Sequence, residues 1–296
     1  MRVLILGGSG MLGHKVWQTF APRFDAYVTF RSAAGADGRA GLFDPERSLG
    51  GVSAQDFDSV TRAFAQVRPR AVVNCIGVVK QDAAAKDPLT SISVNSLFPH
   101  RLAQLTRAAG ARLIHLSTDC VFSGRAGNYS ESDRPDAEDL YGRSKLLGEV
   151  EGEGALTIRT SMIGRELAGA HGLLEWFLSQ EGGRVRGFKR AVFSGFTTGA
   201  LAELLAQIVS EHADLSGVWH AAAEPVNKFE LLSLIKKAYG LNIDIEPDEA
   251  FVCDRSLVGT RFREATGFRA PSWPELIRQM REDATPYAEM RGPSSR

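Results

Sequence analysis

Short runs of hydrophobic residues alternate, up to residue 161, with segments whose hydrophobic residues recur every three or four positions. The runs are rich in Val, Ile and Leu, as expected for parallel strands that helices cover on both faces. They occupy residues 2–6, 26–30, 71–77, 112–117 and 156–161. Between the first two runs, Leu12, Val16 and Phe20 have the spacing of an amphipathic helix. The alternation predicts βαβ units, and therefore an α/β fold with a doubly wound parallel sheet of the Rossmann type.

The alternation becomes less regular after residue 161. Amphipathic helices are predicted at residues 200–212, 228–240 and 273–283, and a short strand at residues 217–222. We therefore divide the chain into a first domain over residues 1–161 and a smaller, mostly helical one over residues 162–285. Some elements of the second domain are expected to return to the first sheet. Residues 286–296 are expected to form a frayed tail.

The composition and charge are those of an ordinary globular protein. The chain has 35 basic and 35 acidic residues and is 44% hydrophobic, so neither nucleic acid nor a membrane surface is an expected partner. Cys75, Cys120 and Cys253 are too scattered for a disulfide framework, which favours a reducing compartment. The N-terminus reads as a buried strand rather than a targeting signal, so we expect a cytoplasmic protein. The six histidines are dispersed, and no metal site is predicted.

A glycine-rich turn separates the first predicted strand from the first predicted helix. Gly7, Gly10 and Gly13 follow the pattern G-x-x-G-x-x-G, with Met11 and Leu12 between the last two. Such glycines let the backbone turn tightly and approach a pyrophosphate, while the start of the helix offers free N–H groups. The sequence therefore predicts a dinucleotide-binding turn in the first domain.

Arg31 follows the second predicted strand, where NAD-binding proteins usually carry an acidic residue. An arginine suits the 2′-phosphate of NADP instead, because its guanidinium group binds phosphate oxygens in pairs. NADPH is therefore the predicted cofactor, and NADH is the less favoured one.

Candidate catalytic residues follow the fourth predicted strand and lie in the helix after it. Ser117, Thr118 and Asp119 come at the carboxyl end of a strand, where ligands of open α/β sheets bind. Tyr141 and Lys145 are four residues apart and so share one helix face. A free tyrosine has a pKa of about 10, and a neighbouring ammonium lowers it. Tyr141 is therefore a candidate proton donor, tuned by Lys145.

The order of these motifs resembles the extended short-chain dehydrogenase/reductase family, and most closely its dTDP-4-dehydrorhamnose reductase branch. That branch has near-equivalents of "STDCVFSG" at residues 117–124, "YGRSKLLGE" at 141–149 and "RTS" at 159–161. Similar segments also occur in the second half, so the resemblance covers nearly the whole chain. It implies that Thr118 binds the reacting carbonyl oxygen, that Tyr141 supplies the proton, and that Lys145 also holds the nicotinamide ribose.

The turn and the resemblance together assign further residues. For the cofactor they indicate Gly7, Gly10, Met11, Leu12, Gly13, Arg31, Asp56, Cys75, Ile76, Gly77, Asn95, Ser117 and Lys145. For the substrate they indicate Thr118, Asp119, Cys120, Tyr141 and Arg255, the last as a partner for a nucleotide phosphate. Cys120 departs from the family, because related dehydratases have Glu there and rhamnose-type reductases usually have Tyr. Asp56 keeps only the second acid of an Asp-x-x-Asp motif that contacts adenine in the family.

The resemblance implies an NADPH-dependent reductase of the 4-keto group of a nucleotide-linked 4-keto-6-deoxyhexose, serving deoxysugar or polysaccharide synthesis. A homodimer is compatible with it. Three alternatives stay open. The first is a nucleotide-sugar 4-epimerase with bound NAD, and the second is a non-catalytic NADP-binding subunit such as the β subunit of methionine adenosyltransferase. The third is a plain binding or scaffold protein.

Overall fold

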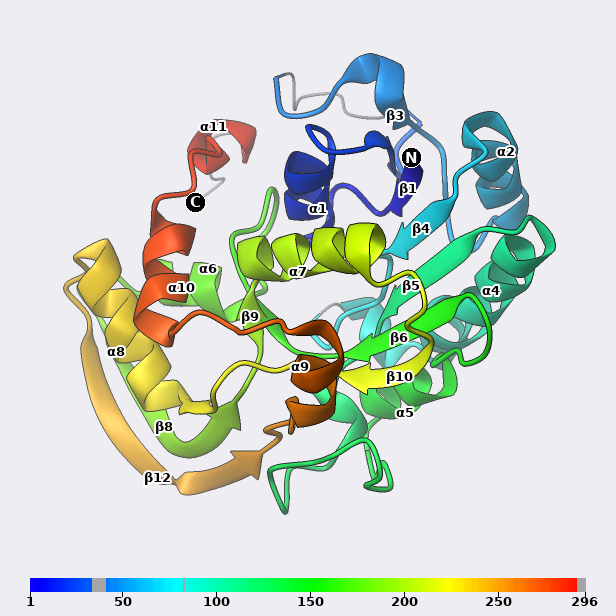
Figure 1. The fold of residues 1–296 in the computed structure, drawn as a ribbon. Helices are drawn as coiled ribbons and strands as arrows, with labels where there is room; N and C mark the ends of the chain where they lie inside the picture. Colours follow the sequence, from blue (N-terminus) through cyan, green and yellow to red (C-terminus); the bar gives the residue numbers. More distant parts are fainter. Residues whose placement is uncertain (34–40, 82, 292–296) are drawn as a thin grey trace.

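The computed structural model describes residues 1–33, 41–81 and 83–291. Its centre is a parallel sheet with the strand order β10-β6-β5-β4-β1-β2-β3, which confirms the predicted doubly wound α/β fold (Figure 1). The strands are β1 (Arg2–Leu6), β2 (Asp25–Thr29), β3 (Ser48–Leu49), β4 (Ala71–Asn74), β5 (Arg112–Leu116), β6 (Ala155–Arg159) and β10 (Gly217–His220). The chain leaves β1 in one direction for β2 and returns to pair β4 on the other side. The carboxyl ends of β1 and β4 therefore mark the switch point at which such sheets bind ligands.

Helices cover both faces of this sheet (Figure 1). Residues of β1 alternate between the faces, so Val3 and Ile5 pack in the same hydrophobic cluster as α1 (Gly13–Phe20) and α7 (Thr198–Glu211). Leu4 and Leu6 belong to the opposite cluster, with α2 (Phe57–Val67) and α4 (Phe98–Ala108). α4 continues from α3 (Pro88–Ser91) through a π-helical segment, η3 (Ile92–Leu97), and α5 (Leu140–Leu147) packs against that segment.

The second half of the chain contributes to both the first sheet and a sheet of its own. β10 pairs with β6, as expected for an element that returns to the first sheet. β8 (Arg184–Phe193) and β12 (Asp244–Asp254) run parallel, with β11 (Val226–Asn227) on the other edge of β8. Helices α8 (Lys228–Tyr239) and α10 (Trp273–Arg281) lie along the inner side of this curved sheet (Figure 1). Smaller elements are β7 (Met162–Ile163), α6 (Leu173–Leu178), β9 (Phe196–Thr197) and α9 (Thr260–Thr266).

The first part of the predicted frayed tail is a packed helix instead. α11 (Tyr287–Met290) places the Tyr287 ring in the core, where its hydroxyl lies 3.0 Å from Nε2 of His14. Arg291 pairs with the buried carboxylate of Glu175. Burial of an aromatic ring and neutralisation of a buried charge offset the loss of chain entropy that would favour fraying. Residues 292–296 lie outside the described residues.

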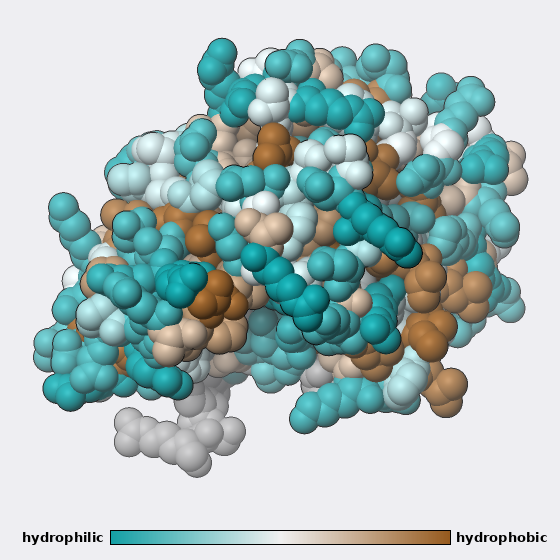
Figure 2. Space-filling view, turned by 90° about the horizontal axis from the view of Figure 1, so that it is seen from below, coloured by the Kyte–Doolittle hydropathy of each residue, from teal (hydrophilic) through white to brown (hydrophobic). Residues whose placement is uncertain are grey.

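The surface mixes polar and hydrophobic residues. Figure 2 shows hydrophilic side chains surrounding separate hydrophobic patches on the face seen from below. Within residues 1–33, 41–81 and 83–291, no helix has the length and hydrophobicity that crossing a bilayer requires.

Candidate active site

The glycine-rich turn between β1 and α1 depends on the absence of side chains. Gly7 has a φ of +88°, in the left-handed region that favours glycine. A Cβ on Gly13 would lie 2.0 Å from the carbonyl oxygen of Gly7, so only glycine lets the helix start this close to the strand. A Cβ on Gly10 would meet only that same oxygen, at 3.4 Å, so this glycine keeps open the space beside the turn. Gly10 therefore leaves room for a ligand beside the turn, whereas Gly13 allows α1 to pack closely against the turn.

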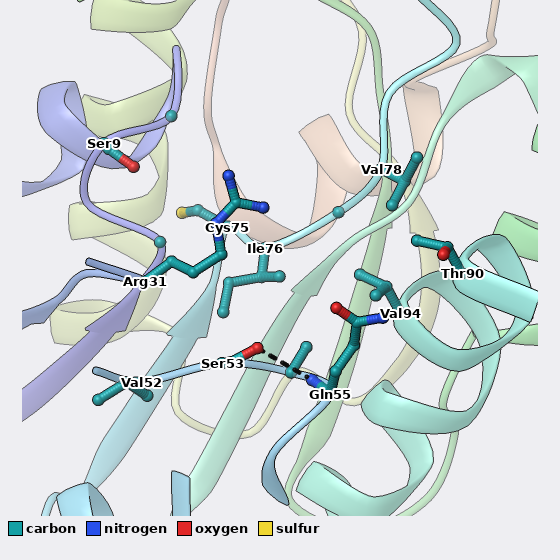
Figure 3. A pocket seen from close by; sticks show the side chains of 14 residues that line it. Ser9, Arg31, Val52, Ser53, Gln55, Cys75, Ile76, Val78, Thr90 and Val94 are labelled. Carbon is teal, nitrogen blue, oxygen red and sulfur yellow. Dashed lines mark hydrogen bonds between the residues drawn. The ribbon is translucent and has the colours of Figure 1, made fainter. Parts of the chain in front are cut away.

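A cavity of about 260 Å³ lies beside this turn, and we call it the glycine-turn cavity. It is lined by Gly7, Ser9, Gly10, Arg31, Val52, Ser53, Ala54, Gln55, Cys75, Ile76, Gly77, Val78, Thr90 and Val94. Arg31 reaches over it from the end of β2 toward Cys75, while Thr90 and Val94 close the opposite side (Figure 3). Burial raises the pKa of Cys75 to about 12, so its thiol stays neutral. The cavity therefore offers backbone groups, hydroxyls and one exposed guanidinium.

Several residues predicted to bind the cofactor lie outside this lining. Leu12 is buried in the hydrophobic core. Asp56 caps α2 by accepting a hydrogen bond from the Ser59 N–H, at 3.3 Å, and it pairs with Arg62 at 3.5 Å. Gln55, its neighbour, lines the cavity in its place.

Asn95 also lies outside the lining, but it shapes one wall of the glycine-turn cavity. Its Oδ1 accepts from the Val78 N–H at 2.9 Å, and its Nδ2 donates to the Val78 carbonyl at 3.0 Å. The same Nδ2 donates to the hydroxyl of Ser144 on α5, at 3.3 Å. Asn95 thus ties the loop after β4 to α5.

A second cavity of about 280 Å³ is lined by Thr118 and Tyr141 but not by Lys145, the third predicted catalytic residue, and we call it the tyrosine cavity. Its lining includes Met11, Val79, Lys80, Gln81, Ser117, Thr118, Asp119, Cys120, Tyr141, Thr160, Ser161, Met162, Ile163, Gly164, Glu166, His171, Gly172, Leu173, Phe193 and Lys228. The two cavities border each other, because Gly10 and Val78 line one while the next residues, Met11 and Val79, line the other. Together they lie at the carboxyl ends of β1, β2, β4, β5 and β6, the expected ligand edge of the sheet.

Thr118 and Asp119 are buried at the end of β5. The Thr118 hydroxyl donates to Oδ1 of Asp119 at 3.2 Å and accepts from the Cys120 N–H at 3.1 Å. Burial raises the pKa of Asp119, and the charges of Arg255 and Lys228 partly offset that effect. Burial also raises the pKa of Cys120 to about 12, so its thiol is not a nucleophile at neutral pH.

Tyr141 keeps its proton in this environment. Burial raises the pKa of its phenol above the usual value, and the negative charge of Cys120 would raise it further, while a hydrogen bond with Thr118 lowers it in part. Lys145 was expected to lower this pKa directly. Its ammonium instead donates to the carbonyl of Leu116 at 2.7 Å, and burial lowers the pKa of Lys145 to about 8. Of the neighbouring groups that act on the pKa of Tyr141, the hydroxyl of Thr118 is therefore the one that lowers it.

A buried network supports the end of β5. The Ser117 hydroxyl donates to Oε1 of Glu149 at 2.6 Å, and Arg159 on β6 donates to both carboxylate oxygens of Glu149, at 2.8 and 2.7 Å. Arg159 also lies 3.3 Å from Nε2 of His220 on β10. The charge of Glu149 raises the pKa of Lys145 and so opposes the effect of burial. The network thus links the segment that follows α5 to the carboxyl ends of β5, β6 and β10.

The second half of the chain supplies two cations to this region. Arg255 donates to the carbonyl oxygens of Phe122 and Ser123, at 2.8 and 3.4 Å, and does not belong to the lining of the tyrosine cavity. Lys228 does belong to it, which no sequence pattern predicts, since a lysine at the start of an amphipathic helix is ordinarily solvated. Among the described residues, no group of three or more His, Cys, Asp and Glu side chains could hold a metal ion.

Comparison with known proteins gives partial matches among named relatives. A dTDP-4-dehydrorhamnose reductase of Streptomyces griseus is 36% identical over 149 residues, which is 50% of this chain and 43% of that protein. Methionine adenosyltransferase 2 subunit beta of Danio rerio is 34% identical over 152 residues, or 51% and 43% of the two chains. The matched region thus spans less than half the length of either relative.

Solved structures share the fold over nearly the full length. The dTDP-4-dehydrorhamnose reductase of Bacillus anthracis, solved in complex with NADP, superposes with a TM-score of 0.76 at 19% identity, covering 94% of this chain and 98% of that one. The family model described as the RmlD substrate binding domain matches residues 1–284. Because this match includes both cavities and almost all of the sequence, the chain belongs to the RmlD substrate binding domain family.

Proposed function

We propose that the protein is an NADPH-dependent reductase of the 4-keto group of a nucleotide-linked 4-keto-6-deoxyhexose. The observation that carries this proposal is the tyrosine cavity, where a protonated Tyr141 and the Thr118 hydroxyl lie together beside the glycine-turn cavity. Reduction of a ketone needs a proton donor at the oxygen, and a phenol that keeps its proton at neutral pH meets this need. The family membership and the NADP complex of the Bacillus anthracis reductase support the same reaction.

The glycine-turn cavity fits a dinucleotide by its own chemistry. Space is kept open at Gly10, backbone N–H groups lie at the start of α1, and Arg31 can bind a 2′-phosphate. The nicotinamide cofactor would supply hydride when bound. The rest of the reaction falls to the chain, which aligns the ketone and stabilises the charge that develops on its oxygen.

Three side chains have distinct parts in this mechanism. The Thr118 hydroxyl orients the ketone oxygen, and Tyr141 donates its proton to that oxygen as negative charge develops. Lys145 lies outside the lining of the cavity, where its ammonium donates to the Leu116 carbonyl, and we assign it the binding of the nicotinamide ribose. Its pKa of about 8 means that it is mostly charged at neutral pH.

A non-catalytic NADP-binding subunit is the main competing function, because methionine adenosyltransferase 2 subunit beta matches over 152 residues at 34% identity and the reductase over 149 residues at 36%. A 4-epimerase would use the same catalytic residues but would be purified with its cofactor bound. Turnover of NADPH with a 4-keto sugar nucleotide excludes the first, and loss of all cofactor on gel filtration excludes the second. We suggest a panel of dTDP-, UDP- and GDP-linked 4-keto-6-deoxy sugars, monitored by NADPH absorbance and product stereochemistry.

The Tyr141→Phe variant tests the proposal directly. It removes the proton donor and leaves the ring, so we expect kcat to fall by about 100-fold or more while the Kd for NADPH changes little. Tyr27→Phe is the matched control, because Tyr27 lies on β2 and lines neither cavity. It should leave kcat unchanged. Equal turnover by the Tyr141→Phe variant and the wild type would refute the assignment.

A further inference from the structure

Lys228 is the first residue of α8, and its side chain enters the tyrosine cavity from the second half of the chain. The ammonium lies 4.2 Å above the centre of the Phe193 ring. Within the part of the chain that the structure describes, it makes no hydrogen bond and no salt bridge, so its three N–H donors are unused. Unused donors at the wall of a binding cavity point to an oxygen-bearing ligand.

The position is unfavourable for a lysine unless a ligand binds there. Burial lowers the pKa of Lys228 to about 8, and the negative charges that Asp119, Cys120 and Cys253 can carry only partly offset the effect. Arg255 acts on the same Asp119 and adds a second positive charge nearby. A hydrophobic residue against Phe193 would cost less desolvation free energy than this ammonium. The stability of the fold therefore does not explain why a lysine occupies this position.

Asp119, in the first half of the chain, provides a carboxylate acceptor that complements the ammonium donors of Lys228. Its buried carboxylate follows Thr118 directly, so it lies next to the group that is proposed to hold the reacting carbonyl. The Thr118 hydroxyl donates to its Oδ1 at 3.2 Å and the Cys120 thiol is a second neighbour, but two carboxylate oxygens have further acceptor capacity for a ligand. The cavity thus presents one acceptor and one donor of opposite charge beside the catalytic residues.

We propose that Lys228 and Asp119 form the subsite that binds the sugar ring, with Lys228 donating to ring substituents and Asp119 accepting from a hydroxyl beside the carbonyl. This inference rests on the proposed function, and it adds Lys228 as a specificity-determining residue. Because the two charges offset each other, the subsite suits an uncharged hexose better than a sugar that carries a carboxylate. In this proposal the pair contacts the sugar and not the nucleotide.

Binding measurements on the full chain test the subsite. We would titrate dTDP-glucose against dTDP, and UDP-glucose against UDP, into the wild type and the Lys228→Met and Lys228→Arg variants, by calorimetry at pH 7. Lys228→Met should weaken the binding of the sugar nucleotide by about tenfold or more, as expected for loss of a charged hydrogen bond. It should leave the Kd for the free nucleoside diphosphate and for NADPH unchanged. Lys228→Arg should recover part of the loss, because it restores the charge and the donors.

The charge balance gives a second, independent measurement. The ratio of the Kd values for UDP-glucuronate and UDP-glucose should fall in Asp119→Asn, where the positive charge is unopposed, and rise in Lys228→Met. A sugar nucleotide that binds the wild type and Lys228→Met equally well would overturn the subsite and leave the proposed reductase intact. A wild type that binds none of these nucleotide sugars, and turns over no 4-keto sugar nucleotide, would overturn the proposed function and the subsite together.

Discussion

Arg31 is the residue on which the choice between the two nicotinamide cofactors depends. It is exposed and reaches over the glycine-turn cavity from the end of β2 (Figure 3). A guanidinium in this place contributes to affinity only if the ligand brings an anionic group, because the ribose hydroxyl of NADH offers no charge to pair with. Substitution of Arg31 should therefore abolish the preference for NADPH over NADH without disturbing the glycine-rich turn.

The Arg31→Ser variant should weaken NADPH binding by about tenfold and change NADH binding little, since one charged hydrogen-bond donor is lost for the 2′-phosphate alone. Fluorescence titration of both cofactors against both proteins measures this. Arg62→Ser is the control, because Arg62 is another exposed arginine, paired with Asp56 and absent from the cavity lining. If Arg31→Ser lowers the affinity for both cofactors equally, Arg31 does not recognise the 2′-phosphate of NADPH.

Single residues differ in how far the sequence reveals their roles. Gly7 and Gly10 could be recognised, because a turn that approaches a ligand requires residues without side chains. Lys228 could not, because its place in the tyrosine cavity depends on how α8 packs on the second sheet, which no local pattern encodes. The direct effect of Lys145 on Tyr141 was also expected from helix spacing, yet Lys145 turns to the Leu116 carbonyl. Spacing brings two residues to one face but does not fix the direction of a long flexible side chain.

Among the elements, the π-helical segment η3 has the clearest link to the cavities. It lies between α3 and α4 and carries Asn95, whose side chain holds both main-chain groups of Val78 and the hydroxyl of Ser144. π-helical turns are often found at functional sites, where the widened turn redirects a side chain. Here the redirected side chain fixes the loop after β4, which lines both cavities.

Replacing Asn95 by Ala should therefore affect stability and cofactor binding together. It leaves the buried N–H and carbonyl of Val78 without partners, so we expect a loss of about 2–3 kcal/mol in the free energy of unfolding. NADPH should bind about tenfold more weakly, because the loop must then be ordered on binding. Urea unfolding and fluorescence titration measure the two effects.

The control is Ser96→Ala, which removes only the hydrogen bond from the Ser96 hydroxyl to the Ser144 carbonyl and should leave NADPH affinity unchanged. Unaltered NADPH binding in Asn95→Ala would show that the loop keeps its shape without this side chain.

The strands of the first sheet were predictable except for the two-residue β3, whereas the second sheet was not predictable. β1, β4 and β5 are compact hydrophobic runs because helices cover them on both faces. β8 and β12 are half exposed, and their charged residues pair across the strands, as Arg184 does with Asp244 at 2.9 Å. Such strands lack a hydrophobic run, and acidic residues and Pro247 disfavour strand formation locally. β8 and β12 are stabilised by pairing with each other, and such pairing between distant segments cannot be predicted from local sequence.

At the scale of the whole molecule, a buried ion cluster joins the end of the chain to the wall of the tyrosine cavity. Glu175 on α6 accepts from Arg165 at 2.6 Å and from Arg291, which follows α11. Arg291 also donates to the carbonyl of Glu166 at 3.0 Å, and Glu166 lines the tyrosine cavity. The Glu175 carboxylate is almost fully buried, so the cluster is largely protected from solvent screening.

Glu175→Gln should destabilise the protein at neutral pH by about 3 kcal/mol, because it leaves two arginines at a buried site without a counter-charge. Burial raises the pKa of Glu175, but the hydrogen bonds and charges of Arg291 and Arg165 lower it by more, so the net pKa lies below its ordinary value of 4.5. The contribution is therefore complete above about pH 4.5 and is lost as the pH falls through the folded-state pKa. Urea unfolding of the wild type and Glu175→Gln from pH 7 to pH 3 should show a constant difference in the free energy of unfolding, which shrinks only at the acid end.

The control is Arg278→Gln, which breaks exposed pairs with Glu275 and Glu282 and should leave the unfolding midpoint nearly unchanged at every pH. A Glu175→Gln protein as stable as the wild type at pH 7 would mean that the cluster does not anchor α11 to the cavity wall.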